Sequence, residues 1–169
     1  SSLAIGVDLG GTHVLAVLMD RQGAILARHG QSLSAADRGS TPLIVGALVD
    51  CISSVHRQAP STAPVLGIGV AVPGNVDPAT SSTRYLPNFG WLEPVALGDA
   101  ILGQLVDGVA LRERLGVDRV HMRNDGRCAA LAERHFGVGA GGDHAVLAML
   151  TLGTGIGGAL IHDPTPARK

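Results

Sequence analysis

Two neighbouring polar residues, Asn124 and Asp125, follow a short segment at residues 119–123 and precede a helical pattern that begins at Gly126. They therefore stand where a predicted strand ends and a predicted helix begins, which is the edge at which open α/β sheets bind ligands. A carboxylate at this edge can accept a proton from a substrate hydroxyl. The alternative is structural, because Asp is also a favoured helix N-cap. The pair predicts either a general base or a cap, and the motifs around it favour the base.

Two glycine-rich turns have the composition of phosphate-binding loops. Each consists of small residues after an apolar run, namely Gly10, Gly11 and Thr12 in the first glycine turn and Gly153, Thr154 and Gly155 in the second glycine turn. With no bulky side chain in the way, the backbone N–H groups of such turns can line a phosphate. Asp8, at the end of the strand before the first turn, is placed to hold Mg²⁺ through water. The alternative for the first turn is an ordinary hairpin with a polar flank.

Aromatic residues are unusually concentrated. Phe, Trp and Tyr make up only 2% of the chain, yet three of them lie close to Asn88, namely Tyr85, Phe89 and Trp91. A core that used aromatic rings for bulk would scatter them, so the cluster predicts a shaped surface pocket. The alternative is a loop that plugs a small satellite core.

The hydrophobic pattern predicts the elements that position these residues. Three short strands separated by turn signals predict an antiparallel meander, at residues 3–8, 14–19 and 24–29. A polar loop at residues 30–40 leads to a helix from residue 41 to about residue 59, with one apolar face. The near-continuous apolar run at residues 65–72 is typical of a buried parallel strand, reached by a right-handed crossover. These patterns predict an α/β fold with a mixed sheet flanked by helices.

The second half of the chain contains further elements by the same criteria. Helices are expected at residues 97–106, at residues 109–115 with Gly116 as a stop, and at residues 126–135, and strands at residues 145–152 and 159–161. Leu150 to Asp163 resembles Val7 to Asp20 as strand, glycine turn and strand. This second unit suggests that residues 1–144 form one lobe and that residues 145–169 begin a similar, truncated second lobe.

Composition excludes several classes of protein. The chain has 169 residues and a net charge of −1, and its Lys and Arg residues are scattered, so no nucleic-acid footprint is predicted. No apolar run reaches the ~18 residues that span a bilayer, and no secretory signal is evident. Cys51 and Cys128 form no CxxC motif and are expected to be reduced thiols. We therefore expect a cytoplasmic protein that binds neither nucleic acid nor membrane.

Five short motifs resemble those of the ROK family (repressor, open reading frame, kinase) of sugar kinases, and of bacterial glucokinases in particular. In order, they are Asp8-Leu-Gly-Gly-Thr12, Gly69-Val-Ala-Val-Pro-Gly-Asn-Val-Asp77, Leu86-Pro-Asn-Phe-Gly-Trp91, Asn124-Asp-Gly-Arg-Cys-Ala-Ala-Leu-Ala-Glu133 and Leu152-Gly-Thr-Gly-Ile-Gly-Gly158. Their order and spacing are far more specific than any one motif, and they cover nearly the whole chain. The resemblance implies the actin-like ATPase fold, in which two ribonuclease-H-like lobes hold ATP and sugar in a cleft.

The resemblance implies a role for each matching residue. Asp125 corresponds to the base for the sugar 6-hydroxyl, and Asn88 and Asn124 correspond to residues that hydrogen-bond the sugar hydroxyls. Gly74, in the turn after residues 65–72, belongs to the same substrate site. The two glycine turns correspond to the phosphate loops for ATP, with Asp8 near Mg²⁺. Phosphoryl transfer requires mostly placement and charge stabilisation, so these parts are sufficient in kind.

The chain departs from the family pattern in several places. The second lobe is absent, and so is the zinc segment with its Gly-His and Cys-x-Cys-Gly motifs. His13 stands where many members have Lys, and residues 92–108 resemble an insertion. The resemblance therefore identifies the N-terminal lobe of a hexose kinase, most simply a glucokinase. The missing partner lobe predicts an exposed apolar interface and hence a homo-oligomer.

Two other functions fit the same motifs. One is the sugar-binding domain of a ROK repressor, but such proteins usually carry a helix-turn-helix before the first strand, where this chain has only Ser1 and Ser2. The other is an inactive fragment. The choice of hexose, and of ATP or polyphosphate as donor, is left open by the residues present.

Overall fold

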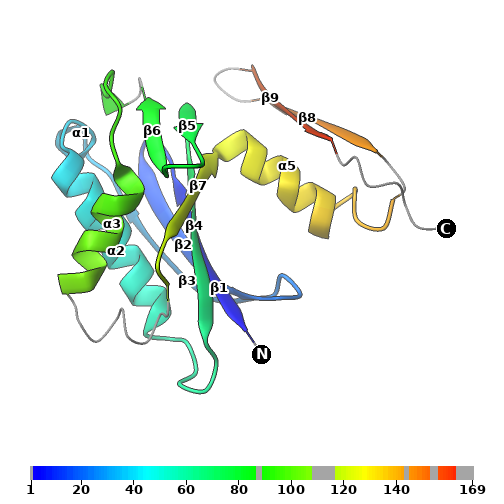
Figure 1. Ribbon diagram of the computed structural model, residues 1–169, viewed down its shortest axis with the longest axis horizontal. Coiled ribbons are helices and arrows are strands. Elements are labelled where there is room, and N and C mark those ends of the chain that lie inside the picture. The colour runs from blue at the N-terminus through cyan, green and yellow to red at the C-terminus, as the bar shows by residue number, and fades with distance from the viewer. Residues whose placement is uncertain (1, 87–88, 108–116, 143–144, 153–155, 163–169) are drawn as a thin grey trace. The chain divides into compact units, whose positions relative to one another are not determined.

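The computed structural model describes residues 2–86, 89–107, 117–142, 145–152 and 156–162 (Figure 1). The chain forms two compact units, Ser1–Arg123 and Asn124–Lys169, which are considered separately below. Among the described helices, none combines the length and apolar character that are required to cross a bilayer.

A five-stranded mixed sheet forms the centre of the first unit. Its order is β3-β2-β1-β4-β7, with β1 (Leu3–Leu9), β2 (His13–Asp20), β3 (Ile25–Ser32), β4 (Val65–Val72) and β7 (Val120–Asn124). β1, β2 and β3 form the predicted antiparallel meander, and β4 is parallel to β1, also as predicted. The predicted α/β fold with a mixed sheet is therefore confirmed.

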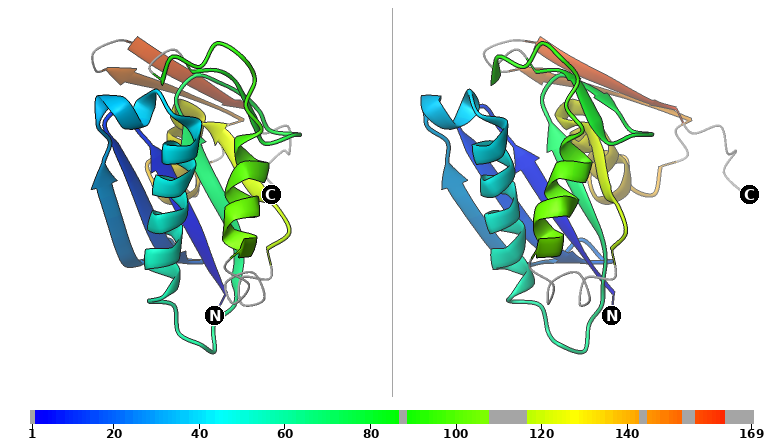
Figure 2. Two further views of the ribbon diagram at one scale, coloured as in Figure 1. Left: turned by 90° about the vertical axis from the view of Figure 1, so that its left-hand side faces the viewer. Right: turned by 60° about the vertical axis from the view of Figure 1, so that its left-hand side comes forward.

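Two helices cover one face of this sheet. α2 (Thr41–His56) and α3 (Leu97–Asp107) lie side by side on it (Figure 2), and every second residue of β1 is buried beneath them. β4 alternates in the same way from Ile68 to Val72, after an irregularity in its pairing with β1, and Leu66 is 59% exposed. The apolar run of β4 thus predicted the parallel pairing correctly. It also predicted that both faces of the strand would be buried, which is wrong for Leu66, because the helices of this unit pack on one face of the sheet.

The segment between β3 and α2 is more ordered than the polar loop expected at residues 30–40. β3 continues to Ser32, and a one-turn helix, α1 (Ala35–Arg38), follows it. A capping box forms this helix: the Asp37 N–H donates to Ser34 Oγ over 3.2 Å, and the Ser34 N–H donates to Asp37 Oδ2 over 2.6 Å. The sequence signal was Ser-x-x-Asp, which composition alone does not reveal.

A small hairpin follows β4 and leads to the aromatic segment. β5 (Asn75–Asp77) and β6 (Ser82–Tyr85) pair antiparallel. Ser81, between them, has a positive φ of 51°, and its hydroxyl donates to the Val120 carbonyl over 2.6 Å in a buried position. The hairpin is therefore anchored to the start of β7.

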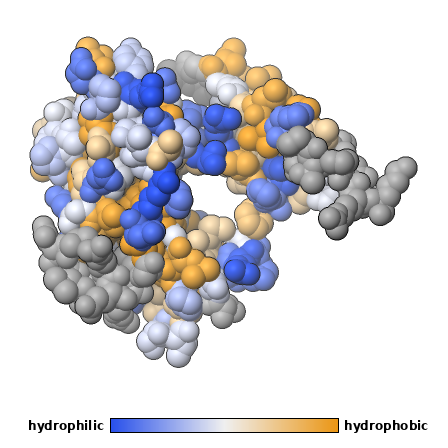
Figure 3. All heavy atoms as spheres, in the orientation of Figure 1, coloured by the Kyte–Doolittle hydropathy of each residue, from blue (hydrophilic) through white to orange (hydrophobic). Residues whose placement is uncertain are grey.

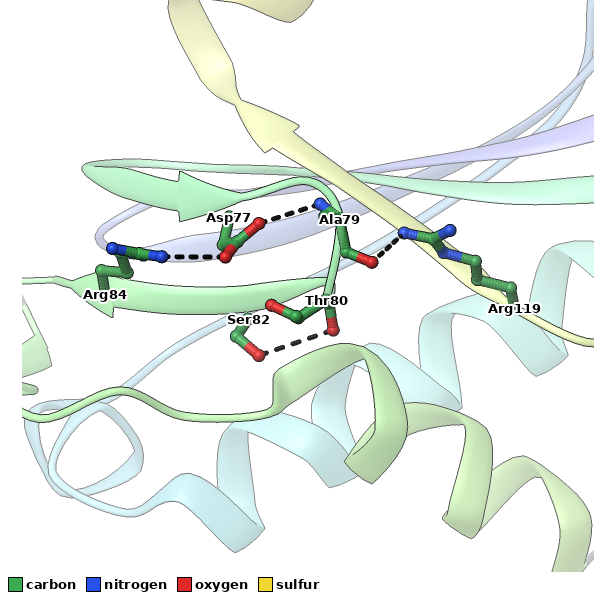
Figure 4. A network of polar contacts seen from close by, with 6 residues as sticks. All are labelled: Asp77, Ala79, Thr80, Ser82, Arg84 and Arg119. Carbon is green, nitrogen blue, oxygen red and sulfur yellow. Dashed lines mark hydrogen bonds and ion pairs between the residues drawn. The ribbon is translucent and has the colours of Figure 1, made fainter.

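Charged side chains hold the turn of this hairpin (Figure 4). Arg84 Nη2 donates to Asp77 Oδ2 over 2.9 Å, and the Ala79 N–H donates to Asp77 Oδ1 over the same 2.9 Å. These bonds, the Arg84 contact first, hold the pKa of the Asp77 carboxyl below its ordinary value. Arg119 donates to the carbonyls of Pro78 and Ala79 over 2.6 and 2.7 Å. The hairpin is thus fixed from both sides.

Gly74 occupies a position that the backbone itself restricts to glycine. Its φ is +90°, and a Cβ atom would overlap the Tyr85 carbonyl oxygen. We expect Gly74→Ala to lower the free energy of unfolding by about 2–4 kcal/mol, because positive φ and a backbone clash both oppose the methyl group. Chemical denaturation measures this change.

Gly46 provides the matched control, since it lies inside α2 with no atom within 4 Å of the place that a Cβ would take. Gly46→Ala should raise stability by about 0.5–1 kcal/mol, because alanine favours a helix interior. Equal unfolding midpoints for the two alanine variants would contradict the role assigned to the Gly74 backbone.

The second unit consists of a helix and a hairpin. α5 (Asp125–Phe136) packs against β8 (Val146–Leu152) and β9 (Ile156–His162), which pair antiparallel from Val146–His162 to Leu152–Ile156. The predicted helix and strands are confirmed, as is the helix α3 in the first unit. The helix expected at residues 109–115 lies outside the described residues.

The hairpin of the second unit exposes an apolar face. Alternate residues of β8 and β9 are exposed, and Figure 3 shows hydrophobic side chains gathered over these strands. The largest are Val146, Leu150, Leu152, Ile156 and Leu160, which are 48–81% exposed. A two-stranded hairpin with such a face is poorly protected from water. We call these five residues the hairpin face.

Candidate functional site

Two turns of the first unit meet at one edge of the sheet. β1 and β4 are parallel, with Asp8 beside Ala71, so their carboxyl ends lie next to each other. The first glycine turn follows β1, and the turn that contains Gly74 follows β4. The topology therefore brings these two predicted site segments together, at the kind of edge where α/β proteins bind ligands.

The first glycine turn is closed by its own backbone. The Gly10 N–H donates to the His13 carbonyl over 2.9 Å, and the Leu33 N–H donates to the Thr12 carbonyl over 2.8 Å. In the described part of the chain, no acceptor is bound by the N–H groups of Gly11 and Thr12. Two of the three predicted phosphate-binding residues thus present backbone donors, whereas the donor of Gly10 is used within the turn.

Gly11 has no structural reason to be glycine. Its φ is not in the left-handed region, and no heavy atom lies within 4 Å of the place where a Cβ would stand. At Gly10, by contrast, a Cβ would lie 2.9 Å from the His13 ring. The space beside Gly11 is therefore open, and it adjoins two N–H groups that bind no acceptor among the described residues. A phosphate could approach the backbone there and accept from both groups.

The side chain of Asp8 lies at the base of this turn and is 51% exposed, with Oδ2 3.9 Å from His13 Nε2. A single carboxylate suits Mg²⁺, which keeps most of its water ligands and shares the rest with substrate phosphates. Within the described residues, no three His, Cys, Asp or Glu side chains form a metal-binding group. Asp8 therefore fits a role beside a hydrated Mg²⁺–phosphate rather than within a protein cage.

Asn124, and not Asp125, caps α5. Asn124 has extended backbone angles (φ −61°, ψ 141°), and its Oδ1 accepts from the Arg127 N–H over 3.2 Å. The alternative that Asp125 is the N-cap is therefore wrong. Asp125 occupies the first helical position instead, and its side chain is not needed to begin the helix.

The carboxylate of Asp125 is exposed and held in one orientation. Its Oδ1 accepts from the Asn124 amide over 2.9 Å and from the Gly126 N–H over 2.7 Å. Because the oxygen of the Asn124 amide is fixed by the cap, its nitrogen is directed at Asp125. Across the described residues, no donor is bound to Oδ2, which makes Oδ2 the oxygen available to a substrate.

The aromatic loop is a plug rather than a pocket. The Leu86 N–H donates to the Trp91 carbonyl over 2.9 Å, and the Trp91 N–H donates back over 3.1 Å. Phe89 and Trp91 are 3% and 8% exposed, belong to the main core, and have ring centroids 5.6 Å apart. Tyr85 alone is exposed. Phe89 and Trp91 therefore pack into the main core, which differs both from the predicted surface pocket and from the satellite core of the alternative.

Several predicted site residues lie outside the described residues, namely Asn88, Gly153, Thr154 and Gly155. The pair Leu152–Ile156 closes the hairpin on either side of the second glycine turn, as the sequence pattern predicted. One contact at the first glycine turn was not predicted: Arg38 Nη1 donates to the Gly11 carbonyl over 3.1 Å. The Ser-x-x-Asp capping signal, which ends in a helix with Arg38 as its last residue, could have drawn attention to it.

Comparison with known proteins gives a consistent result. The ROK family model matches residues 4–168. A glucokinase of Streptomyces coelicolor is 33% identical over 159 residues, which is 94% of this chain and 43% of that protein. A putative xylose repressor of Caldicellulosiruptor is 28% identical over 94% of the chain and 36% of its own length.

Solved structures show the same relationship. The ROK family glucokinase of Streptomyces griseus, in complex with glucose and AMPPNP, matches with a TM-score of 0.74 and 28% identity over 99% of this chain and 47% of that chain. The fold is the one that these sugar kinases share, the actin-like ATPase fold. The chain spans less than half the length of the glucokinases that it matches.

Proposed function

The chain belongs to the ROK family, and from this premise we propose that it is the N-terminal lobe of an ATP-dependent hexose kinase. Residues 1–144 then form the first lobe, and residues 145–169 begin the second. The observation that carries the proposal is the exposed Asp125 carboxylate: its Oδ1 is held by the Asn124 amide and the Gly126 N–H, the N-cap of the helix is Asn124, and Oδ2 binds no donor among the described residues.

The proposed chemistry combines residues that the structure describes with Asn88 and the second glycine turn, which lie outside the described residues. Oδ2 of Asp125 accepts the proton of a hexose hydroxyl, the 6-hydroxyl of glucose in the simplest case. The hydroxyl oxygen attacks the γ-phosphorus of ATP, and the bond from that phosphorus to ADP breaks as ADP leaves. Asn124 holds the carboxylate, and Asn88 and the Gly74 turn bind the other sugar hydroxyls. The N–H groups of Gly11 and Thr12 bind phosphate oxygens of ATP, together with the second glycine turn. Mg²⁺ near Asp8 supplies charge neutralisation for the phosphates.

The experiment that tests this function is a panel of hexoses and donors with sugar phosphate as the readout. It uses the chain alone and a two-lobe version, in which the second half of the Streptomyces coelicolor glucokinase follows this chain. Phosphorylation of a hexose by the two-lobe version with ATP is expected. Replacing ATP by polyphosphate identifies the donor. Sugar binding without transfer from any donor would overturn the kinase and favour a sugar-binding repressor domain, which the xylose repressor relative makes the second candidate.

Self-association of the chain alone is a further expectation, because the hairpin face is apolar and exposed. Light scattering should show oligomers that grow with concentration. Leu152→Asp, at a residue that is 81% exposed, should shift the distribution towards monomer. Leu26→Asp on β3, at a residue that is 52% exposed, is the matched control and should change little. A strictly monomeric wild-type chain would contradict the expectation.

A further inference from the structure

The one-turn helix α1 has a defined shape despite its length. Both halves of its capping box are made, and the Ser40 N–H donates to the Asp37 carbonyl over 3.0 Å just beyond it. The hydrogen bonds from Ser34 hold the pKa of the Asp37 carboxyl below its ordinary value. Asp37 is therefore ionised, and the box is closed, at neutral pH. The last residue of this helix, Arg38, is consequently held in a fixed place.

Arg38 joins α1 to the first glycine turn. It is half-buried, and its Nη1 donates to the carbonyl of Gly11, a residue 27 positions earlier in the chain. The neighbouring carbonyl, that of Thr12, accepts from the Leu33 N–H at the start of the same segment. The β3–α1 segment thus binds two successive carbonyl groups of the turn, one through its backbone and one through a charged side chain.

The geometry of the peptide bond gives the Arg38 contact a consequence. In a trans peptide the C=O of one residue and the N–H of the next point in opposite directions. No peptide bond of the described chain is cis, so the bond that fixes the Gly11 carbonyl towards Arg38 directs the Thr12 N–H away from it. Glycines at positions 10 and 11 would otherwise leave these peptide planes free to rotate.

We propose that Arg38 is a positioning residue for phosphate binding: it holds the Gly11 carbonyl and thereby directs the Thr12 N–H at the phosphate oxygens of the nucleotide. The inference rests on the proposed function, since it requires the first glycine turn to bind the donor phosphates. The guanidinium suits this task, because it forms strong charge-assisted bonds to an oxygen.

The test compares three variants of the two-lobe version with wild type. Arg38→Met removes the donors but keeps a long apolar stem, and Arg38→Lys keeps a charged donor. Arg57→Met removes the arginine at the C-cap of α2, a helix about 24 Å long whose N-terminus lies nearer α1. The Kd for AMPPNP with Mg²⁺ is measured by calorimetry, the KM for sugar by turnover, and the order parameter of the Thr12 amide by NMR relaxation in the nucleotide-free protein.

Arg38→Met is expected to weaken AMPPNP about 10-fold and to lower the order parameter of the Thr12 amide, because the Gly11–Thr12 peptide plane is no longer held. The KM for sugar should stay unchanged, and the melting temperature should fall by a few degrees at most, since one hydrogen bond is lost. Arg38→Lys should restore affinity to within about 3-fold of wild type, and Arg57→Met should match wild type.

The two proposals fail in distinguishable ways. Unchanged AMPPNP affinity in Arg38→Met, with wild-type binding intact, overturns the role of Arg38 and leaves the kinase proposal standing. An unchanged order parameter of the Thr12 amide also overturns it, whatever the turn binds. A wild-type protein that binds no AMPPNP overturns the kinase proposal, and the role of Arg38 falls with it.

Discussion

Asp125→Ala should lower kcat for hexose phosphorylation by about 10²–10⁴-fold in the two-lobe version, the range that removal of a general base produces. Sugar binding should largely persist, because the carboxylate is expected to act on the hydroxyl proton in the transition state. Asp125→Asn makes the test sharper. An amide oxygen can still accept from Asn124 and from the Gly126 N–H, so the local geometry is retained while the proton acceptor is lost.

Controls for Asp125 separate chemistry from stability. The helix cap belongs to Asn124, so α5 should form in both variants and the circular dichroism spectrum should not change. Asp118→Asn removes another exposed carboxylate, just before β7, and should leave kcat at the wild-type value. Wild-type turnover in Asp125→Asn would refute the role of base.

The mixed sheet could be predicted because its signals are local. Alternating apolar residues and turn signals defined β1, β2 and β3, and a continuous apolar run identified β4 as parallel. Burial was less predictable, since Leu66 and Val70 look alike in sequence but face opposite sides of the sheet. Which side a helix covers depends on packing between elements, and a single strand does not encode it.

For the site, too, local motifs were easier to predict than contacts between segments that are distant in sequence. The motif at residues 124–125 placed the carboxylate correctly at a strand–helix junction, but the choice of cap depended on the extended backbone at Asn124. The aromatic cluster was assigned to a pocket from composition, whereas Phe89 and Trp91 complete the core. Arg38 was missed because its partner is a backbone carbonyl distant in sequence: the Ser-x-x-Asp signal marks the helix that carries Arg38 but not the group that Arg38 contacts.

Glycine content alone also fails to separate two kinds of glycine, those that the fold requires and those that a ligand requires. Gly74 has positive φ and a carbonyl in the place of its missing Cβ, so the backbone explains it without any ligand. Gly11 has neither constraint. Both residues were placed in the predicted site. We expect a substitution at Gly74 to lower stability and a substitution at Gly11 to weaken ligand binding.

Gly11→Ala is therefore expected to weaken AMPPNP about 10- to 100-fold without loss of stability. The added methyl group meets no protein atom within 4 Å, so the fold should tolerate it or gain slightly from a less flexible unfolded chain. A phosphate that accepts from the N–H groups of Gly11 and Thr12 would be displaced by the methyl group and would lose one or two charge-assisted bonds. Calorimetry with AMPPNP and Mg²⁺ measures the loss, and chemical denaturation measures stability.

Gly46→Ala is the control here as well, because it adds the same methyl group to an open position inside α2 and should not change the Kd. A lower unfolding midpoint in Gly11→Ala would assign this glycine to the fold. Unchanged affinity with unchanged stability would show that no phosphate approaches the turn, since no other group in the described chain opposes a side chain there. The donor of a phosphoryl group would then have to be bound elsewhere, and the proposed kinase would lack its first phosphate loop.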